Sequence, residues 1–175
     1  MTKFLFVRHG EPDYDTAGDW AKVPLGLNYA SLSANGEEQI ERACERLACY
    51  DVDIIVSSPF TRTMQGAAIM ARALDVPVAV ERDLHEWIVD TSYSIMDGDK
   101  VAALCRDRDN CNGIYPEGET RVWESTEMVR TRVLNCLKKY QKYKCVVVSG
   151  HAIMMQSVFG INTPLEYGQI MELDI

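Results

Sequence analysis

The sequence predicts an α/β fold, a three-layer α/β/α sandwich with a mainly parallel central sheet and helices on both faces. Two observations support this prediction. An apolar run occurs at residues 4–7 and β-branched runs occur within 53–58 and 145–149, as is typical of strands covered on both faces. In the segments between these runs, apolar residues recur at the spacing of amphipathic helices. Strands that alternate with helices in this way assemble into a parallel sheet.

The first half of the chain contains two predicted helices. Residues 12–32 are rich in Asp, Gly, Pro and Asn, and we expect a long loop there that folds over the site. Ser33 can cap the first helix, and acidic residues follow it in the first turn. The second helix is predicted over residues 59–74, opened by its proline.

The second half of the chain is less regular before residue 119 than after it. The remaining elements are predicted as a short strand (76–80), a short helix (101–107), a long amphipathic helix (119–142), a central strand (145–149), a helix (152–159) and an edge strand (167–173) that can run antiparallel. We expect a single domain over residues 1–175, with a short lid-like insertion around 87–118.

Composition restricts the classes of partner. The 175 residues are 47% apolar and 25% charged, as in ordinary globular domains, and the formal net charge is −8. This charge disfavours nucleic acid and anionic membranes as partners, because both would be repelled. The N-terminal apolar run is too short for a signal or membrane segment, so we expect a cytoplasmic protein. Six scattered cysteines without a Cys-x-x-Cys pair predict neither a disulfide framework nor a zinc site.

Basic and imidazole side chains follow three of the predicted strands. Arg8 and His9 end the first, Arg62 comes shortly after the second, and His151 follows the strand that ends at residue 149. Parallel strands bring these residues to one edge of the sheet, where ligands of α/β proteins bind. The N–H donors of an arginine guanidinium and the free backbone N–H groups at a helix N-terminus both suit phosphate oxygens. A glycine such as Gly10, which has no side chain, lets the backbone approach a phosphoryl group. The sequence therefore predicts a phosphate site, the alternative being strands that end in polar turn residues.

A carboxylic acid is needed to complete phosphoryl chemistry at such a site. A neutral imidazole can attack phosphorus, and the leaving oxygen then needs a proton. Glu86 is the best candidate donor because Leu84 and Trp87 can shield it from water. Asp83 and Asp90 are the alternatives in the same irregular segment.

Ordered segments along nearly the whole chain resemble the histidine phosphatase superfamily, the phosphoglycerate-mutase-like enzymes. A single Arg-His-Gly triplet is a weak signal, but several matches in the right order are specific. The matching segments are Arg8-His9-Gly10-Glu11, Leu32-Ser33 with Gly36 and Gln39, Ser57-Ser58-Pro59 with Arg62 and Gln65-Gly66-Ala67, Leu84 with Glu86, Pro116 with Gly118-Glu119-Thr120, and Ser149-Gly150-His151.

The resemblance implies a role for each matching site residue. His9 would be the nucleophile that becomes phosphorylated. Arg8, Arg62 and His151 would form the phosphate pocket, His151 with a catalytic part, and Glu86 would act as acid and later as base for water. The resemblance implies neither a metal nor another cofactor. Glu11, beside the arginine, is expected to be structural. The alternative for Arg8 is a structural ion pair with Glu11, but its place at the strand end favours phosphate.

The function that we expect is hydrolysis of a phosphomonoester, or of a phosphoprotein, through a phosphohistidine on His9. A small phosphorylated substrate is the expected partner, and the sequence carries no signal for oligomeric state. One alternative is a phosphoglycerate-mutase-type phosphoryl transferase. The other is a non-catalytic phosphate-binding regulatory domain, favoured by two departures from the family pattern: Asp15 replaces a common asparagine, and a Gly-rich segment is missing after Glu86.

Overall fold

The computed structural model, which describes residues 1–22, 24–94 and 97–175, is built on a five-stranded sheet with the strand order β5-β4-β6-β1-β7. β5, β4, β6 and β1 are parallel, and β7 pairs antiparallel with β1 at the edge. This confirms the predicted sheet. The strands are β1 (Lys3–Arg8), β4 (Ile54–Ser57), β5 (Val78–Val80), β6 (Cys145–Gly150) and β7 (Ile170–Asp174).

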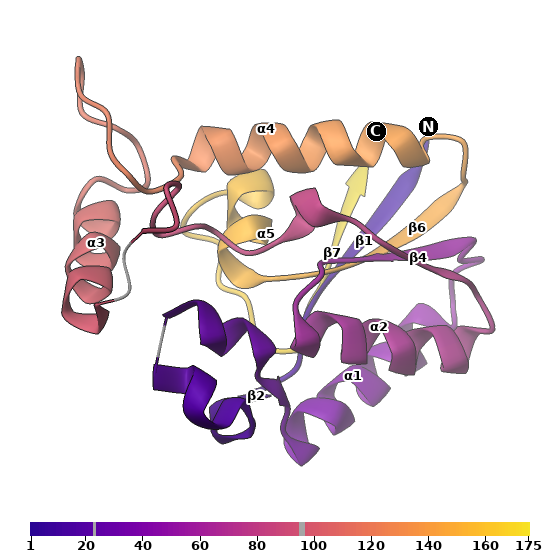
Figure 1. Ribbon diagram of the computed structural model, residues 1–175. Coiled ribbons are helices and arrows are strands. Elements are labelled where there is room, and N and C mark those ends of the chain that lie inside the picture. Colours follow the sequence, from indigo (N-terminus) through magenta and orange to yellow (C-terminus); the bar gives the residue numbers. More distant parts are fainter. Residues whose placement is uncertain (23, 95–96) are drawn as a thin grey trace.

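Helices cover both faces of the sheet (Figure 1). α1 (Ala34–Leu47) and α2 (Thr61–Leu74) pack on one face, and α4 (Thr126–Leu137) and α5 (Ala152–Phe159) pack on the other. α3 (Gly98–Asn110) lies to one side of these layers. Successive β1 side chains point to opposite faces, so Phe4 and Phe6 join the core under α4 and α5 while Leu5 and Val7 join the core over α1 and α2.

The strand register places the predicted site residues side by side. Arg8 lies opposite Gly150 in the β1–β6 pair, so His9 and His151 each follow the last paired position of neighbouring strands. Ser57 of β4 lies opposite Ser149 of β6. The three strand ends therefore meet at one edge of the sheet, as the sequence predicts.

The segment 12–32 is more regular than the loop that the sequence predicts. It contains the antiparallel pair β2 (Pro12–Asp13) and β3 (Ser31–Leu32), with two 3-10 helices between them, η1 (Tyr14–Lys22) and η2 (Pro24–Tyr29). The hydroxyl oxygen of Thr16 joins its two ends by accepting the N–H and O–H of Ser31. Asp15 is exposed on η1.

The N-termini of α1 and α2 differ in how they are capped. Ser33 caps α1 as predicted, its hydroxyl accepting the Gly36 N–H at 3.0 Å. The predicted start of α2 at Pro59 is wrong, because the helix begins at Thr61 after an N-cap at Phe60. The Ser58 hydroxyl oxygen accepts the N–H of this N-cap residue at 3.4 Å and also lies 2.7 Å from His151 Nε2.

The helix predicted over residues 119–142 is shorter than expected. α4 begins only at Thr126, where the Ser125 hydroxyl caps the Met128 N–H, and it ends at Leu137 before the short 3-10 helix η4 (Lys138–Tyr140). Within residues 119–125, Val122 accepts the backbone N–H of Thr91 and Glu124 donates its backbone N–H to the Ile88 carbonyl.

The predicted insertion also differs in detail. α3 spans 98–110 rather than 101–107, because Asp97 caps it by accepting the N–H groups of Asp99 and Lys100. The strand predicted at 76–80 is limited to β5. Residues 95–96, within the insertion, lie outside the described residues.

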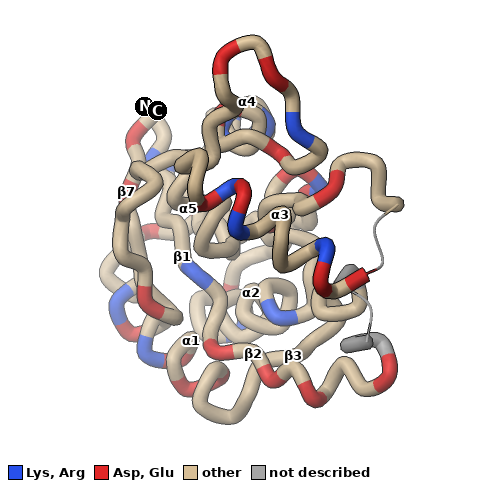
Figure 2. The backbone as a smooth tube through the Cα atoms, turned by 90° about the vertical axis from the view of Figure 1, so that its left-hand side faces the viewer, with Lys and Arg blue, Asp and Glu red and all other residues tan. Residues whose placement is uncertain are grey.

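Basic and acidic residues are interspersed along the backbone in the view of Figure 2, with acidic residues near β2 and β3. All six cysteines are free. In the part of the chain that the structure describes, no helix combines the length and apolarity needed to cross a membrane.

Candidate active site

The first imidazole of the site is held in one tautomer. His9 directly follows β1, and its backbone N–H donates to the Gly150 carbonyl at 3.0 Å. Its Nδ1 lies 2.7 Å from the Gly10 carbonyl oxygen. Because a carbonyl only accepts, Nδ1 carries the proton. Nε2 therefore keeps its lone pair, which accepts a hydrogen bond from Arg62 Nε at 3.2 Å.

Arg62 joins the two imidazoles of the site. It lies in the first turn of α2 and is 6% exposed. Besides bonding His9, its guanidinium lies 3.4 Å from His151 Nδ1 and donates to the Leu27 carbonyl at 3.3 Å. A single fork of donors therefore faces both histidines and the backbone of η2, which shows that the segment 12–32 does fold over the site.

His151 is fully buried between β6 and α5. Since arginine only donates, Nδ1 of His151 accepts from Arg62. The other nitrogen, Nε2, then carries the proton and donates to Ser58 Oγ at 2.7 Å. Ser58 thus orients His151, a role that sequence reasoning did not assign to it.

Burial and the arginine keep both imidazoles neutral. Burial is the main cause that lowers the pKa of His9 to about 3, and the positive charge of Arg62 adds to it. The same two causes, in the same order, hold the pKa of His151 well below its usual value. A neutral imidazole retains the lone pair that a nucleophile needs.

Arg8 approaches the site from the end of β1. Its Nη1 donates to the Leu165 carbonyl at 2.7 Å, and its guanidinium stands 4.1 Å from the centre of the Tyr167 ring. The same ring is 5.7 Å from the His9 ring, centre to centre. Arg8 Nε is buried and has no hydrogen-bond partner among the described residues.

Glu11 serves the first helix rather than Arg8. Its two carboxylate oxygens accept from Ser33 Oγ at 2.9 Å and from Asn35 Nδ2 at 3.0 Å. Its backbone N–H donates to Gln39 Oε1 at 2.7 Å. These contacts tie the loop after His9 to the first turns of α1, which is the structural role expected for this residue.

Gly10 has a reason to be glycine other than the one expected. A Cβ at this position would lie 2.1 Å from the Gly36 carbonyl oxygen, which is closer than any real contact. The backbone after β1 therefore passes close to the backbone of the first turn of α1 at Gly36. The Gly10 carbonyl oxygen also fixes the tautomer of His9 by accepting from its Nδ1. A contact of Gly10 with phosphate stays a prediction.

We expect Gly10→Ala to destabilise the protein by about 3 kcal/mol, because the added methyl group meets backbone that cannot move aside cheaply. The measurement is the free energy of unfolding in urea. Gly98→Ala is the matched control, since a Cβ on Gly98 meets nothing within 4 Å. Equal stabilities of the two variants would contradict the crowding argument.

Glu86 lies at the N-terminus of α5. Its Oε1 accepts the backbone N–H groups of Trp87 and Met154, both at 2.9 Å, and its Oε2 accepts that of Ile153 at 3.2 Å. The first turn of a helix is a favourable place for a carboxylate. These contacts fix the carboxylate next to the helix that begins after His151.

The alternative carboxylates are engaged elsewhere. Asp90 is buried, and its oxygens accept the N–H and O–H groups of Ser92 and Ser94 within their own turn. Asp83 bonds the Nε of the preceding arginine at 3.1 Å. Of these three acidic residues, Glu86 is the one whose carboxylate is bound at the start of α5.

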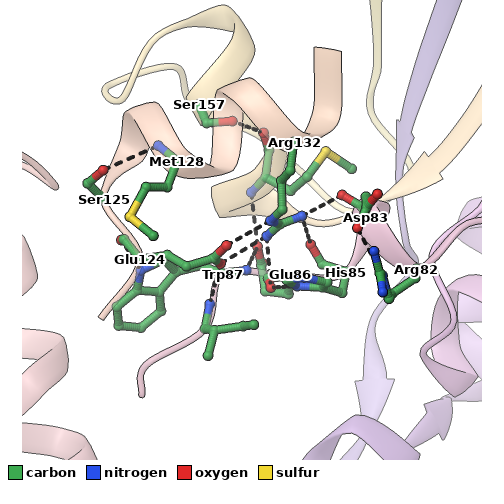
Figure 3. A network of polar contacts seen from close by, with 12 residues as sticks. Arg82, Asp83, His85, Glu86, Trp87, Glu124, Ser125, Met128, Arg132 and Ser157 are labelled. Atoms are coloured by element: carbon green, nitrogen blue, oxygen red, sulfur yellow. Dashed lines mark hydrogen bonds and ion pairs between the residues drawn. The ribbon is translucent and has the colours of Figure 1, made fainter. Parts of the chain in front are cut away.

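A buried ion pair supports the segment that carries Glu86 (Figure 3). Arg132 of α4 makes a two-pronged contact with Glu124, at 2.8 Å from Nε and 3.0 Å from Nη2. The same guanidinium donates to the carbonyl oxygens of Asp83, His85 and Glu86 at 2.6, 2.9 and 3.3 Å. Arg132 therefore organises three backbone carbonyls around the candidate acid.

Glu124 holds the next residues of the same segment. Its Oε2 accepts the Ile88 N–H at 2.9 Å, and its backbone N–H donates to the Ile88 carbonyl. The Trp87 indole N–H donates to the Glu124 carbonyl at 2.7 Å. Together Arg132 and Glu124 fix the backbone from residue 83 to residue 88.

We expect Arg132→Met to destabilise the protein by about 3–5 kcal/mol, because Glu124 would be left as a buried charge without its partner. Their side chains are only 14% and 7% exposed. Urea unfolding measures the loss of stability. Adding Glu124→Leu to Arg132→Met should restore part of the lost free energy of unfolding, because it removes the unpaired charge. The control is Arg42→Met, which breaks an exposed pair with Glu38 and should cost less than about 0.5 kcal/mol. Similar losses in Arg132→Met and Arg42→Met would contradict this account.

Sequence reasoning missed Arg132, Glu124 and the Tyr167 ring. One signal was available for Arg132, which is three residues after Val129 and four before Cys136 and so borders the apolar stripe of its helix. A charge at that border is a candidate for burial. Tyr167 carries no comparable signal, because its contact with Arg8 depends on how the chain enters β7. Among the described residues, no group of His, Cys, Asp and Glu side chains could hold a metal ion.

Comparison with known proteins identifies relatives of the whole chain. The model of the histidine phosphatase superfamily (branch 1) matches residues 4–174. Phosphoserine phosphatase 1 of Hydrogenobacter thermophilus is 26% identical, over 91% of this chain and 75% of its own length. The protein named probable phosphoglycerate mutase GpmB in Citrobacter koseri is 25% identical, over 89% and 72%.

Solved structures share the fold. A mycobacterial glucosyl-3-phosphoglycerate phosphatase aligns with a TM-score of 0.71 at 18% identity, covering 99% of this chain and 91% of its own. YhfR of Bacillus stearothermophilus aligns with a TM-score of 0.70 at 16% identity, covering 100% and 92%. With a family model that spans almost every residue, the chain belongs to the histidine phosphatase superfamily.

Proposed function

We propose that the protein is a phosphomonoester hydrolase that works through a phosphohistidine on His9. The observation that carries the proposal is the position of the Arg62 guanidinium, between Nε2 of His9 and Nδ1 of His151. A phosphoryl group bound by this fork would lie against the lone pair of a neutral imidazole. Such placement converts attack on phosphorus into an intramolecular step.

The first step transfers the phosphoryl group to the enzyme. Nε2 of His9 forms a bond to phosphorus while the bond from phosphorus to the alcohol oxygen breaks, and the electron pair stays on that oxygen. Protonated Glu86, fixed at the start of α5, supplies the proton for the departing alcohol. Arg62 and Arg8 stabilise the charge on the transferring oxygens.

The second step returns the enzyme to its starting state. Glu86, now a carboxylate, takes a proton from a water molecule whose oxygen attacks phosphorus. The bond between phosphorus and Nε2 breaks, its electrons return to the imidazole, and inorganic phosphate leaves. No redox partner or metal is needed to balance the two steps.

Contacts around the arginines support phosphate as their ligand. Arg62 Nη1 donates to the Leu27 carbonyl, a weak neutral acceptor that a phosphate oxygen can replace with a stronger, charge-assisted bond. Arg8 Nε has no partner among the described residues. The two guanidinium groups also lie close enough for the charge of Arg8 to lower the pKa of Arg62, although burial is the main cause of that shift.

The test is phosphate release from phenyl phosphate by the wild-type protein and by His9→Ala. We expect steady turnover by the wild type, inhibition by orthovanadate, and loss of turnover in the variant. Arg72→Met, an exposed change on α2, controls for nonspecific effects of substitution. Equal rates for wild type and His9→Ala would end the proposal.

The same assay separates the two alternatives. A phosphoglycerate mutase would convert 3- to 2-phosphoglycerate without net release of phosphate. A regulatory domain would bind phosphate or vanadate in an Arg62-dependent manner and hydrolyse no member of a broad substrate panel. Either result would replace the hydrolase assignment.

A further inference from the structure

A cavity of about 290 Å³ adjoins the histidine pair, between η2, the turn after β4 and residues 82–93. Phe60 connects it to the phosphate site, because its ring lines the cavity and lies 5.1 Å from the His151 ring. The Arg62 guanidinium stands 5.4 Å from the centre of the same ring. Glu86, the proposed acid, also lines the cavity. Because Glu86 is the proposed proton donor to the departing alcohol, that alcohol would lie on the side of the phosphate site where the cavity begins.

Most of the cavity wall is apolar. Its apolar side chains include Phe60, Trp87, Ile88, Val89 and Tyr93. The indole of Trp87 is fixed by its hydrogen bond to the Glu124 carbonyl. An aromatic wall that is already ordered loses little entropy when a ligand binds, and it packs well against another ring.

The charged groups on the wall do not favour a second anion. Asp90 contributes an acidic side chain, and Glu86 supplies no positive charge in either protonation state. The cation on the described part of the wall is Arg82, whose side chain is 88% exposed and already paired with Asp83. His85 adds no positive charge at neutral pH, because burial lowers its pKa. A carboxylate on the departing alcohol would lose water here without gaining a buried partner.

We propose that this cavity is the leaving-group pocket and that it selects phosphomonoesters of uncharged alcohols that are aromatic or largely apolar. The inference rests on the proposed hydrolase function and adds the substrate class to it. Phosphoserine and phosphoglycerate, which appear in the names of relatives, both carry a carboxylate. Because the described part of the cavity wall offers no buried cation to such a carboxylate, we expect both compounds to be poor substrates for this protein.

The test compares 2-naphthyl phosphate with 3-phosphoglycerate in a matched pair of variants. Aryl phosphates react faster in any case, because their leaving groups are better. The two substrates are therefore compared by the factor by which each variant changes kcat/KM. Val89→Lys places a cation in the pocket. We expect about a tenfold fall in kcat/KM for 2-naphthyl phosphate and a rise for 3-phosphoglycerate. Val80→Lys, on the exposed edge strand β5 and 49% exposed in the wild type, should change neither value.

Inhibition by the free alcohols provides a second readout that needs no variant. We expect 2-naphthol to inhibit competitively at far lower concentration than glycerate. Equal effects of Val89→Lys on both substrates, or stronger inhibition by glycerate, would overturn the pocket assignment while leaving the hydrolase function intact. Failure of the function itself would look different, since no substrate would then show His9-dependent release of phosphate.

Discussion

Arg62→Met is expected to lower kcat/KM for phosphomonoester hydrolysis by about 10³-fold, the range typical for loss of an arginine that stabilises a transferring phosphoryl group. Methionine fills a similar space but donates no hydrogen bond. The variant therefore loses the fork that faces His9 Nε2 and His151 Nδ1. Arg62→Lys keeps the charge without the fork, so it should recover only part of the activity. Steady-state phosphate release measures both effects.

A matched control lies on the same helix. Arg72 is also in α2 but is exposed, and Arg72→Met should retain wild-type kcat/KM. Urea unfolding of Arg62→Met establishes that the variant is folded before its rate is interpreted. A folded Arg62→Met protein with nearly wild-type kcat/KM would show that the guanidinium does not bind the transferring group.

The stability of the protein should fall steeply between pH 6.5 and pH 5. An unfolded histidine has a pKa near 6.5, whereas the pKa of folded His9 is about 3 and that of His151 is lowered well below 6.5. As the pH falls, the unfolded chain binds protons that the folded chain excludes, so the free energy of unfolding decreases. Each histidine contributes up to about 1.4 kcal/mol per pH unit. Urea unfolding at several pH values measures the slope.

Two further measurements identify the source of this slope. His9→Gln removes one of the three histidines whose pKa is lowered, the third being His85, and should reduce the slope by about a third. Inorganic phosphate should protect the protein more at pH 5 than at pH 7.5, because an anion beside the imidazoles raises their pKa and favours proton uptake. A stability that stays flat from pH 6.5 to 5, or a His9→Gln variant with an unchanged slope, would contradict the buried neutral pair.

The sheet and its functional edge were predictable because both depend on local patterns. The apolar runs in β1, β4 and β6 specify buried parallel strands, and parallel pairing brings their ends together. Arg8, His9, Arg62 and His151 therefore come together from sequence position alone. Their hydrogen bonds, and so the tautomers of the two histidines, depend on side-chain packing and needed the structure.

The support around Glu86 was not predictable, because it depends on contacts between residues distant in the sequence. The start of α4 was placed seven residues too early, since Val122 and Glu124 form backbone hydrogen bonds with Thr91 and Ile88 in the segment after Glu86. That pairing brings Glu124 to Arg132, whose guanidinium also donates to the carbonyls of residues 83, 85 and 86. The aromatic cavity wall arises from the same arrangement, in a segment without periodic pattern.

The central claim is a covalent phosphohistidine on His9, and rapid mixing of Glu86→Gln with 4-nitrophenyl phosphate tests it most directly. Nitrophenolate leaves without a proton donor, while water attack still requires Glu86 as base, so the phosphorylated enzyme should accumulate. We predict a burst of nitrophenolate equal to the enzyme concentration, with the phosphoryl group located on His9 by mass spectrometry after quenching in base. Turnover with the phosphoryl group on another residue, or continued turnover when His9→Ala is added to the variant, would contradict the account.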